Sequence, residues 1–124
     1  MLILPIKKKW FDMIRSGEKK EEYREIKSYY TSRLHNEIQI LDSFGQLNYV
    51  KQFSYFNEEG NDVVTKIKDG NMQFYVDVKF RNGYSNNSPS FDATCRVTIG
   101  QGNPKWGAEP NKEYYILRII SIYQ

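Results

Sequence analysis

One stretch of the chain decides the predicted fold and the candidate site: Gly17-Glu18-Lys19-Lys20-Glu21-Glu22-Tyr23-Arg24. Before it, residues 7–16 place Trp10 and Ile14 four positions apart, which is the spacing of one apolar helix face, so we predict a helix here. Gly17 suits the end of that helix, because glycine adopts the left-handed conformation without a Cβ clash and turns the chain sharply. A strand is predicted to follow over residues 20–24.

Side chains of a strand alternate between two faces, so Lys20, Glu22 and Arg24 are predicted to share one face. Lys19 lies in the turn and can lean toward either face. On a concave surface, the ammonium of Lys19 and the guanidinium of Arg24 would bind a phosphate or a base carbonyl, and Glu22 between them would accept N–H donors or a proton. The alternative is a solvated edge strand whose mixed charges discourage edge pairing.

The remaining elements follow from apolar patterns and from turn residues. We predict a short first strand ended by Pro5, a second helix from Ser28 to about Asn36, and a short strand at 38–41. Residues 46–70 are interpreted as strand, interrupted by a turn at 57–62 and followed by another strand at 63–67. The clearest alternation predicts strands at 74–80 and 91–99 with one buried face, and a terminal strand at 114–123. The buried face is predicted to carry Val76, Val78, Cys95 and Val97. Helices followed by several strands indicate an α+β fold with a small barrel.

A second constellation lies in the loop at 100–111, which is rich in Gly and Pro; loops this long are usually functional or mobile. Trp106 beside Lys105 suits stacking on a base. The alternative is that Trp106 closes the barrel mouth and packs on the first helix.

The motif G-x-K-x-x-E-x-R, placed directly after a first helix, resembles the signature of the ASCH domain family, small β-barrels related to the PUA RNA-binding fold. The segment 106–110, followed by 114–117, is similar to the C-terminal part of ASCH proteins of phages and prophages. The resemblance implies a single domain over 1–124, a PUA-like β-barrel of about five to seven strands with two N-terminal helices. Residues 42–72 match nothing in it and are a candidate insertion.

The composition limits the protein to a few classes. A chain of 124 residues is one domain, and its apolar stretches are too short to span a membrane. A single cysteine and a single histidine exclude an internal disulfide and argue against a zinc site, and no nucleotide-cofactor motif is present, so we expect no cofactor and no metal. The net charge is +3, and residues 1–35 hold nine Lys or Arg against five acidic residues, which suits a phosphate-bearing partner. We expect a cytoplasmic protein, monomeric or weakly dimeric.

Three functions are compatible with these features. The first is an RNA- or nucleoside-binding module, whose partner would be RNA, a nucleoside or a nucleotide. Its ligand-binding residues would be Lys19, Glu22, Arg24, Lys105, Trp106 and Glu109. The second is a hydrolase, either a ribonuclease or an amidohydrolase of acylated cytidine: the resemblance places Lys19 on the family's catalytic lysine, whereas Glu22 occupies the position of a threonine. The third is a phage protein-interaction module. Lys19 and Arg24 would hold Glu22 ionised and therefore weakly basic, so we favour binding over catalysis.

Overall fold

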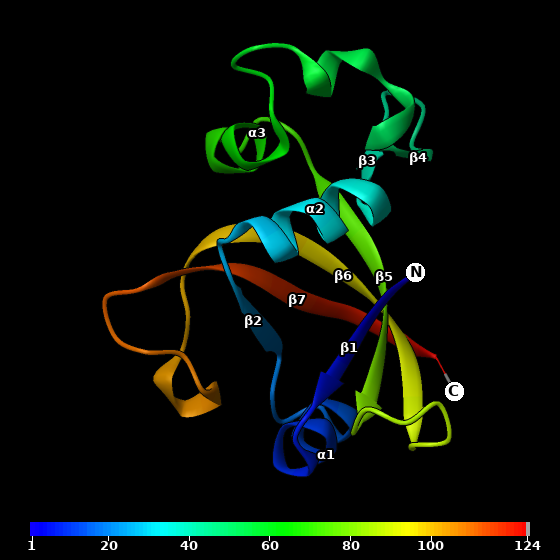
Figure 1. Ribbon diagram of the computed structural model, residues 1–124, viewed down its shortest axis with the longest axis vertical. Coiled ribbons are helices and arrows are strands. Elements are labelled where there is room, and N and C mark those ends of the chain that lie inside the picture. Colours follow the sequence, from blue (N-terminus) through cyan, green and yellow to red (C-terminus); the bar gives the residue numbers. More distant parts are fainter. Residues whose placement is uncertain (124) are drawn as a thin grey trace.

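The computed structural model describes residues 1–123 and has an α+β fold of three helices and a seven-stranded sheet (Figure 1). The helices are α1 (Lys8–Ser16), α2 (Ser28–Glu37) and α3 (Val63–Asp69). The strands are β1 (Leu2–Ile6), β2 (Glu21–Glu25), β3 (Gln39–Leu41), β4 (Leu47–Tyr49), β5 (Phe74–Asn82), β6 (Ser90–Gln101) and β7 (Glu113–Tyr123). Short 3₁₀ turns cover 50–52, 54–57 and 104–106. Within the described residues, no helix is long and apolar enough to cross a membrane.

The sheet follows the order β2-β7-β6-β5-β3-β4, and β1 pairs with β5 alongside this path. Every pairing is antiparallel except that of β1 with β5, which is parallel. The two ends of the path, β2 and β4, do not pair with each other, so the sheet is not closed into a ring. The prediction of an α+β fold with two N-terminal helices and up to seven strands is confirmed; a closed barrel is not.

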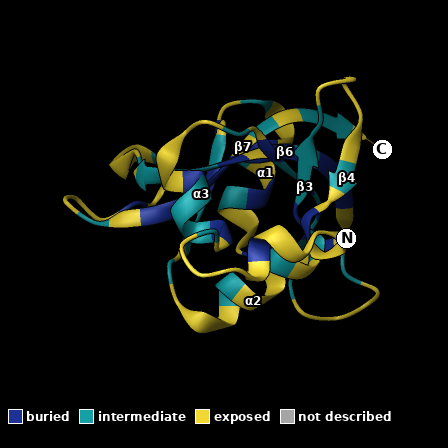
Figure 2. Cartoon of the chain, turned by 90° about the horizontal axis from the view of Figure 1, so that it is seen from above, coloured by how far each residue is buried: buried dark blue, intermediate teal, exposed yellow. Residues whose placement is uncertain are grey.

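The core lies between the sheet and the helices. The alternation predicted for β5 and β6 is confirmed, since Val76, Val78, Cys95 and Val97 are all buried. The predicted helix α1 covers one end of the sheet (Figure 1). There, Phe11 of the helix packs on Phe91 with ring centroids 5.0 Å apart. Figure 2 shows the buried strand segments in the middle of the molecule and the exposed outer face of α2.

The prediction of strand over 63–67 is wrong, because this segment is the helix α3. Its run of β-branched residues favours a strand by propensity alone. The capping residues at the two ends of the segment favour a helix instead. The Asp62 carboxylate accepts the backbone N–H of Thr65, and Gly70 ends the helix with φ 71°. Val63 and Ile67, one turn apart, are buried on the same face. Most of 46–70 is likewise not strand, since only β4 pairs.

The segment 42–72 leaves the sheet after β3 and returns at β5. Its two ends are adjacent, since the backbone N–H of Leu41 donates to the carbonyl of Gln73 at 3.2 Å. Four of its side chains lie in the hydrophobic core: Val50, Phe56, Val63 and Ile67. The segment is therefore part of the packed molecule.

Pro5 does not end the first strand as predicted, because β1 continues to Ile6. Proline lacks an N–H donor, but β1 pairs with β5 alone, and a strand paired on one side tolerates a missing donor on the other. The carbonyl of Pro5 instead accepts a hydrogen bond from Arg24 at 3.3 Å. This bond connects the first strand to the motif.

Candidate functional site

The turn after α1 sets the position of the motif. Gly17 has φ 86°, as predicted for a helix end, and its N–H donates to the carbonyl of Ile14 at 3.0 Å. The N–H of Lys19 then donates to the carbonyl of Met13 at 2.9 Å, which fixes the lysine beneath the helix. From there the chain enters β2, which pairs with β7 along its whole length.

A buried charge cluster forms at the start of β2. One carboxylate oxygen of Glu22 lies 3.2 Å from the Lys19 ammonium, and the other lies 2.8 Å from the Arg24 guanidinium. Lys19 is 1% exposed and Glu22 is 7% exposed. One carboxylate therefore compensates two cations in an environment that largely excludes water, where an uncompensated charge would be strongly destabilising.

Lys19 is enclosed rather than exposed to a ligand. Its ammonium donates to the carbonyl of Trp106 at 2.7 Å and lies over the rings of Trp10 and Tyr23, 4.9 and 5.0 Å from their centroids. Burial lowers the pKa of Lys19, and the nearby Glu22 carboxylate offsets part of this effect. Lys19 thus forms the wall behind Glu22.

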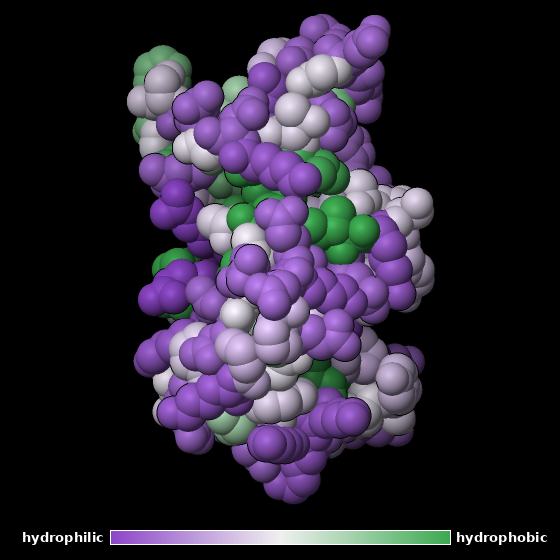
Figure 3. All heavy atoms as spheres, turned by 90° about the vertical axis from the view of Figure 1, so that its left-hand side faces the viewer, coloured by the Kyte–Doolittle hydropathy of each residue, from purple (hydrophilic) through white to green (hydrophobic). Residues whose placement is uncertain are grey.

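The cover loop, residues 102–112 between β6 and β7, closes over this lysine. Gly102 permits the close approach, since a Cβ at this position would lie 2.6 Å from Ala108 and 2.7 Å from the ring of Tyr23. The Tyr23 hydroxyl accepts the N–H of Asn103 at 2.9 Å, and burial raises the pKa of Tyr23 well above its usual range. Figure 3 views the molecule from the side of the cover loop, where hydrophilic residues dominate the surface.

Arg24 extends from the cluster toward β1 and α2. Besides Glu22, it donates to the carbonyl of Pro5 and, at 3.2 Å, to the hydroxyl of Tyr30. Burial acts to lower the pKa of Arg24, but Glu22 and Tyr30 outweigh it, so the pKa is raised further and the guanidinium stays charged. Its Nε is buried and has no hydrogen-bond partner among the described residues.

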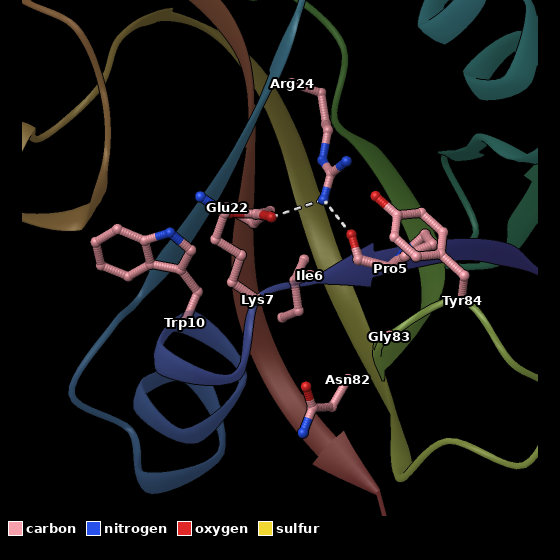
Figure 4. Close-up of a pocket in the computed structure, with 9 residues that line it drawn as sticks. All are labelled: Pro5, Ile6, Lys7, Trp10, Glu22, Arg24, Asn82, Gly83 and Tyr84. Atoms are coloured by element: carbon pink, nitrogen blue, oxygen red, sulfur yellow. Dashed lines mark hydrogen bonds and ion pairs between the residues drawn. The ribbon is translucent and has the colours of Figure 1, made fainter.

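Glu22 and Arg24 open onto a pocket of about 430 Å³, the motif pocket (Figure 4). Trp10 from α1 and Tyr84 from the loop after β5 stand on opposite sides of the carboxylate–guanidinium pair. Tyr84 is 88% exposed and Trp10 is half-buried. The lining residues are Pro5, Ile6, Lys7, Trp10, Glu22, Arg24, Asn82, Gly83 and Tyr84.

The structure brings together three of the predicted ligand-binding residues, whereas the side chains of the other three lie outside the motif pocket. Glu22 and Arg24 line the motif pocket, and Lys19 supports them from behind. Lys105, Trp106 and Glu109 lie in the cover loop and are not among the described residues that line the pocket. Lys105 and Glu109 are exposed. The backbone carbonyl of Trp106 reaches the cluster, whereas its indole Nε1 is buried with no hydrogen-bond partner in the described structure.

Sequence reasoning missed the two aromatic walls of the pocket. The sequence pattern places Trp10 on the apolar face of the first helix and gives no signal for Tyr84. The Asn82-Gly83 dipeptide marks the turn that presents Tyr84, but the parallel pairing of β1 with β5, which brings that turn beside the motif, has no local sequence signal.

Comparison of the chain with protein-family models, with curated proteins and with solved structures gives no match. The resemblance to the ASCH domain family therefore rests only on the motif residues and on the segments 106–110 and 114–117. Among residues 1–123, no group of three or more His, Cys, Asp or Glu side chains is arranged to hold a metal ion.

Proposed function

We propose that this protein is an ASCH-like, PUA-related domain that binds single-stranded RNA or a nucleoside in the motif pocket. One observation carries the proposal: the motif residues Glu22 and Arg24 line a pocket whose sides are the aromatic residues Trp10 and Tyr84. Charged hydrogen-bonding groups between aromatic rings are the means by which proteins hold unpaired bases.

The chemistry of the pocket suits a base with an exocyclic amino group. Each oxygen of Glu22 has one cationic neighbour and retains a further acceptor site, which can take an N–H of cytosine or adenine. Tyr84 is exposed, and its ring offers a stacking surface. Lys7 at the rim adds a positive charge for the RNA backbone.

The same geometry supports binding rather than hydrolysis. A catalytic lysine must reach the reacting atoms, whereas Lys19 is enclosed by Trp10, Tyr23 and the cover loop. Both oxygens of Glu22 are ion-paired with cations, one with Lys19 and one with Arg24, which suits a fixed acceptor. Glu22 therefore serves best as an acceptor that orients Lys19, Arg24 and the ligand.

The proposal is tested by the affinity of a fluorescently labelled single-stranded RNA, measured by anisotropy at several salt concentrations. Tyr84→Ser should weaken binding by roughly tenfold or more, because loss of base stacking costs about 1–3 kcal/mol. Phe44→Ser is the matched control, since Phe44 is 89% exposed and lies outside the motif pocket. Affinity should also fall steeply with salt.

Equal losses of RNA affinity in Tyr84→Ser and Phe44→Ser would show that the motif pocket does not take part in RNA binding. Absence of binding to both the RNA and nucleosides would overturn the proposed function.

A further inference from the structure

We infer that a second pocket on the other side of Arg24 binds a phosphate group, so that the ligand is a nucleotide unit rather than a bare nucleoside. The inference rests on the proposed function and extends it from the base to the phosphate. It is carried by Arg24 of the motif together with Tyr29, Tyr30 and Arg33 of α2, which lie outside the motif.

The second pocket, the arginine pocket, has a volume of about 380 Å³ and adjoins the motif pocket. Pro5, Arg24 and Tyr84 line both pockets. The arginine pocket is completed by Ile3, Leu4, Tyr29, Tyr30 and Arg33, the last three of which come from α2. A ligand held between Trp10 and Tyr84 could therefore extend past Arg24 into the arginine pocket.

The two pockets differ in charge. The motif pocket contains the Glu22 carboxylate, which repels an anion, whereas the residues of the arginine pocket include two guanidinium groups and no acidic side chain. Arg24 is already paired with Glu22. Arg33 has no acidic partner among the described residues, and its guanidinium lies over the ring of Tyr29, 4.6 Å from the centroid.

The donors of the arginine pocket match the needs of a phosphate. A guanidinium presents its N–H groups as a planar fork that suits phosphate oxygens. Arg33 is held over an aromatic ring but keeps these in-plane donors available. The Tyr30 hydroxyl accepts from Arg24, which leaves its own hydrogen to donate to an anion. Base recognition and phosphate recognition are thus divided between the two sides of Arg24.

Titration calorimetry with cytidine, cytidine 5′-monophosphate and cytidine 3′-monophosphate tests this division. At least one monophosphate should bind the wild type about tenfold more tightly than cytidine. Arg33→Gln should remove most of that advantage and leave cytidine binding unchanged. Arg96→Gln is the control for overall charge, because Arg96 is an exposed arginine of β6 that lines neither pocket, and it should keep the advantage.

The outcomes separate the two proposals. Cytidine and both monophosphates binding equally well, or an advantage that survives in Arg33→Gln, would overturn the phosphate site and leave the base site intact. If cytidine does not bind, inorganic phosphate becomes the probe, observed by ³¹P NMR line broadening. Broadening that disappears in Arg33→Gln would keep the phosphate site while the base site fails, and no broadening would overturn the phosphate site as well.

Discussion

Glu22 is the residue on which the buried charges of the site depend. It is the only carboxylate within 4 Å of either Lys19 or Arg24 in the described structure. Removing the partner of a buried cation costs more than the pair itself contributes, because the remaining charge is left without compensation. The motif therefore has a structural role in addition to its proposed role in binding.

Glu22→Gln should accordingly lower the free energy of unfolding by about 3 kcal/mol, measured by urea denaturation at neutral pH. A second variant, Lys19→Met with Glu22→Gln, removes the uncompensated ammonium and should recover part of the loss. The interpretation fails if Glu22→Gln is as stable as the wild type. It also fails if the free energy of unfolding lost in the double variant equals the sum of the losses in Glu22→Gln and Lys19→Met alone.

Cys95 makes the stability of the protein sensitive to alkaline pH. Burial raises the pKa of its thiol from 9.0 to about 12. Below pH 9 the thiol is protonated in both states, but above it the unfolded chain loses the proton first, so this group's stabilising contribution falls as pH rises toward 12. The loss should approach about 1.4 kcal/mol per pH unit.

Urea denaturation between pH 8 and 11 measures this effect. The stability of Cys95→Ala should fall less steeply with pH than that of the wild type, whatever its stability at pH 8. The raised pKa values of Tyr23 and Tyr115 add a loss of the same sign in both proteins, which is why the comparison uses the difference in slope. Parallel slopes would contradict the assignment to Cys95.

At the level of elements, the cover loop depends on the close approach of Gly102 to Tyr23. Gly102→Ala should displace the loop from Lys19 and lower stability by about 1–3 kcal/mol, because the added Cβ meets Ala108 and the Tyr23 ring at less than 3 Å. Gly100→Ala is the matched control, since its Cβ would meet Ile116 at an ordinary 3.6 Å. Limited proteolysis within 102–112 and urea denaturation provide the measurements, and equal behaviour of the two variants would rule out the steric argument.

The elements also show what the sequence can and cannot predict. β5 and β6 were predicted because each has one buried face, so apolar residues recur with a period of two. α3 is not predicted by residue propensity, because its β-branched residues favour a strand. The caps at Asp62 and Gly70, which propensity does not take into account, favour the helix. The cluster of Glu22 with Lys19 and Arg24 follows from local spacing. The aromatic walls of the motif pocket do not, since they depend on pairing between segments far apart in the chain.

For the whole molecule, the segment 42–72 should prove necessary for stability although its ends are close enough to be joined. A chain in which a short Gly-Asn linker replaces residues 43–71 should lose several kcal/mol of unfolding free energy, because each buried Val, Ile or Phe contributes about 1.5–3 kcal/mol. Thermal denaturation of the two chains provides the comparison. Unchanged stability would identify the segment as a dispensable insertion.

The pairing of β1 and β2 has a consequence for the timing of folding during synthesis. β1 pairs with a strand that begins at Phe74, and β2 with one that begins at Glu113. The motif residues therefore leave the ribosome well before β7, the strand that orders them, has been made. Contacts of such long sequence separation form slowly, because chain entropy is lost before they can stabilise the fold. Until β5 and β7 have been made, the nascent chain presents the basic residues 1–35 without their strand partners to the RNA-rich surface on which it is made.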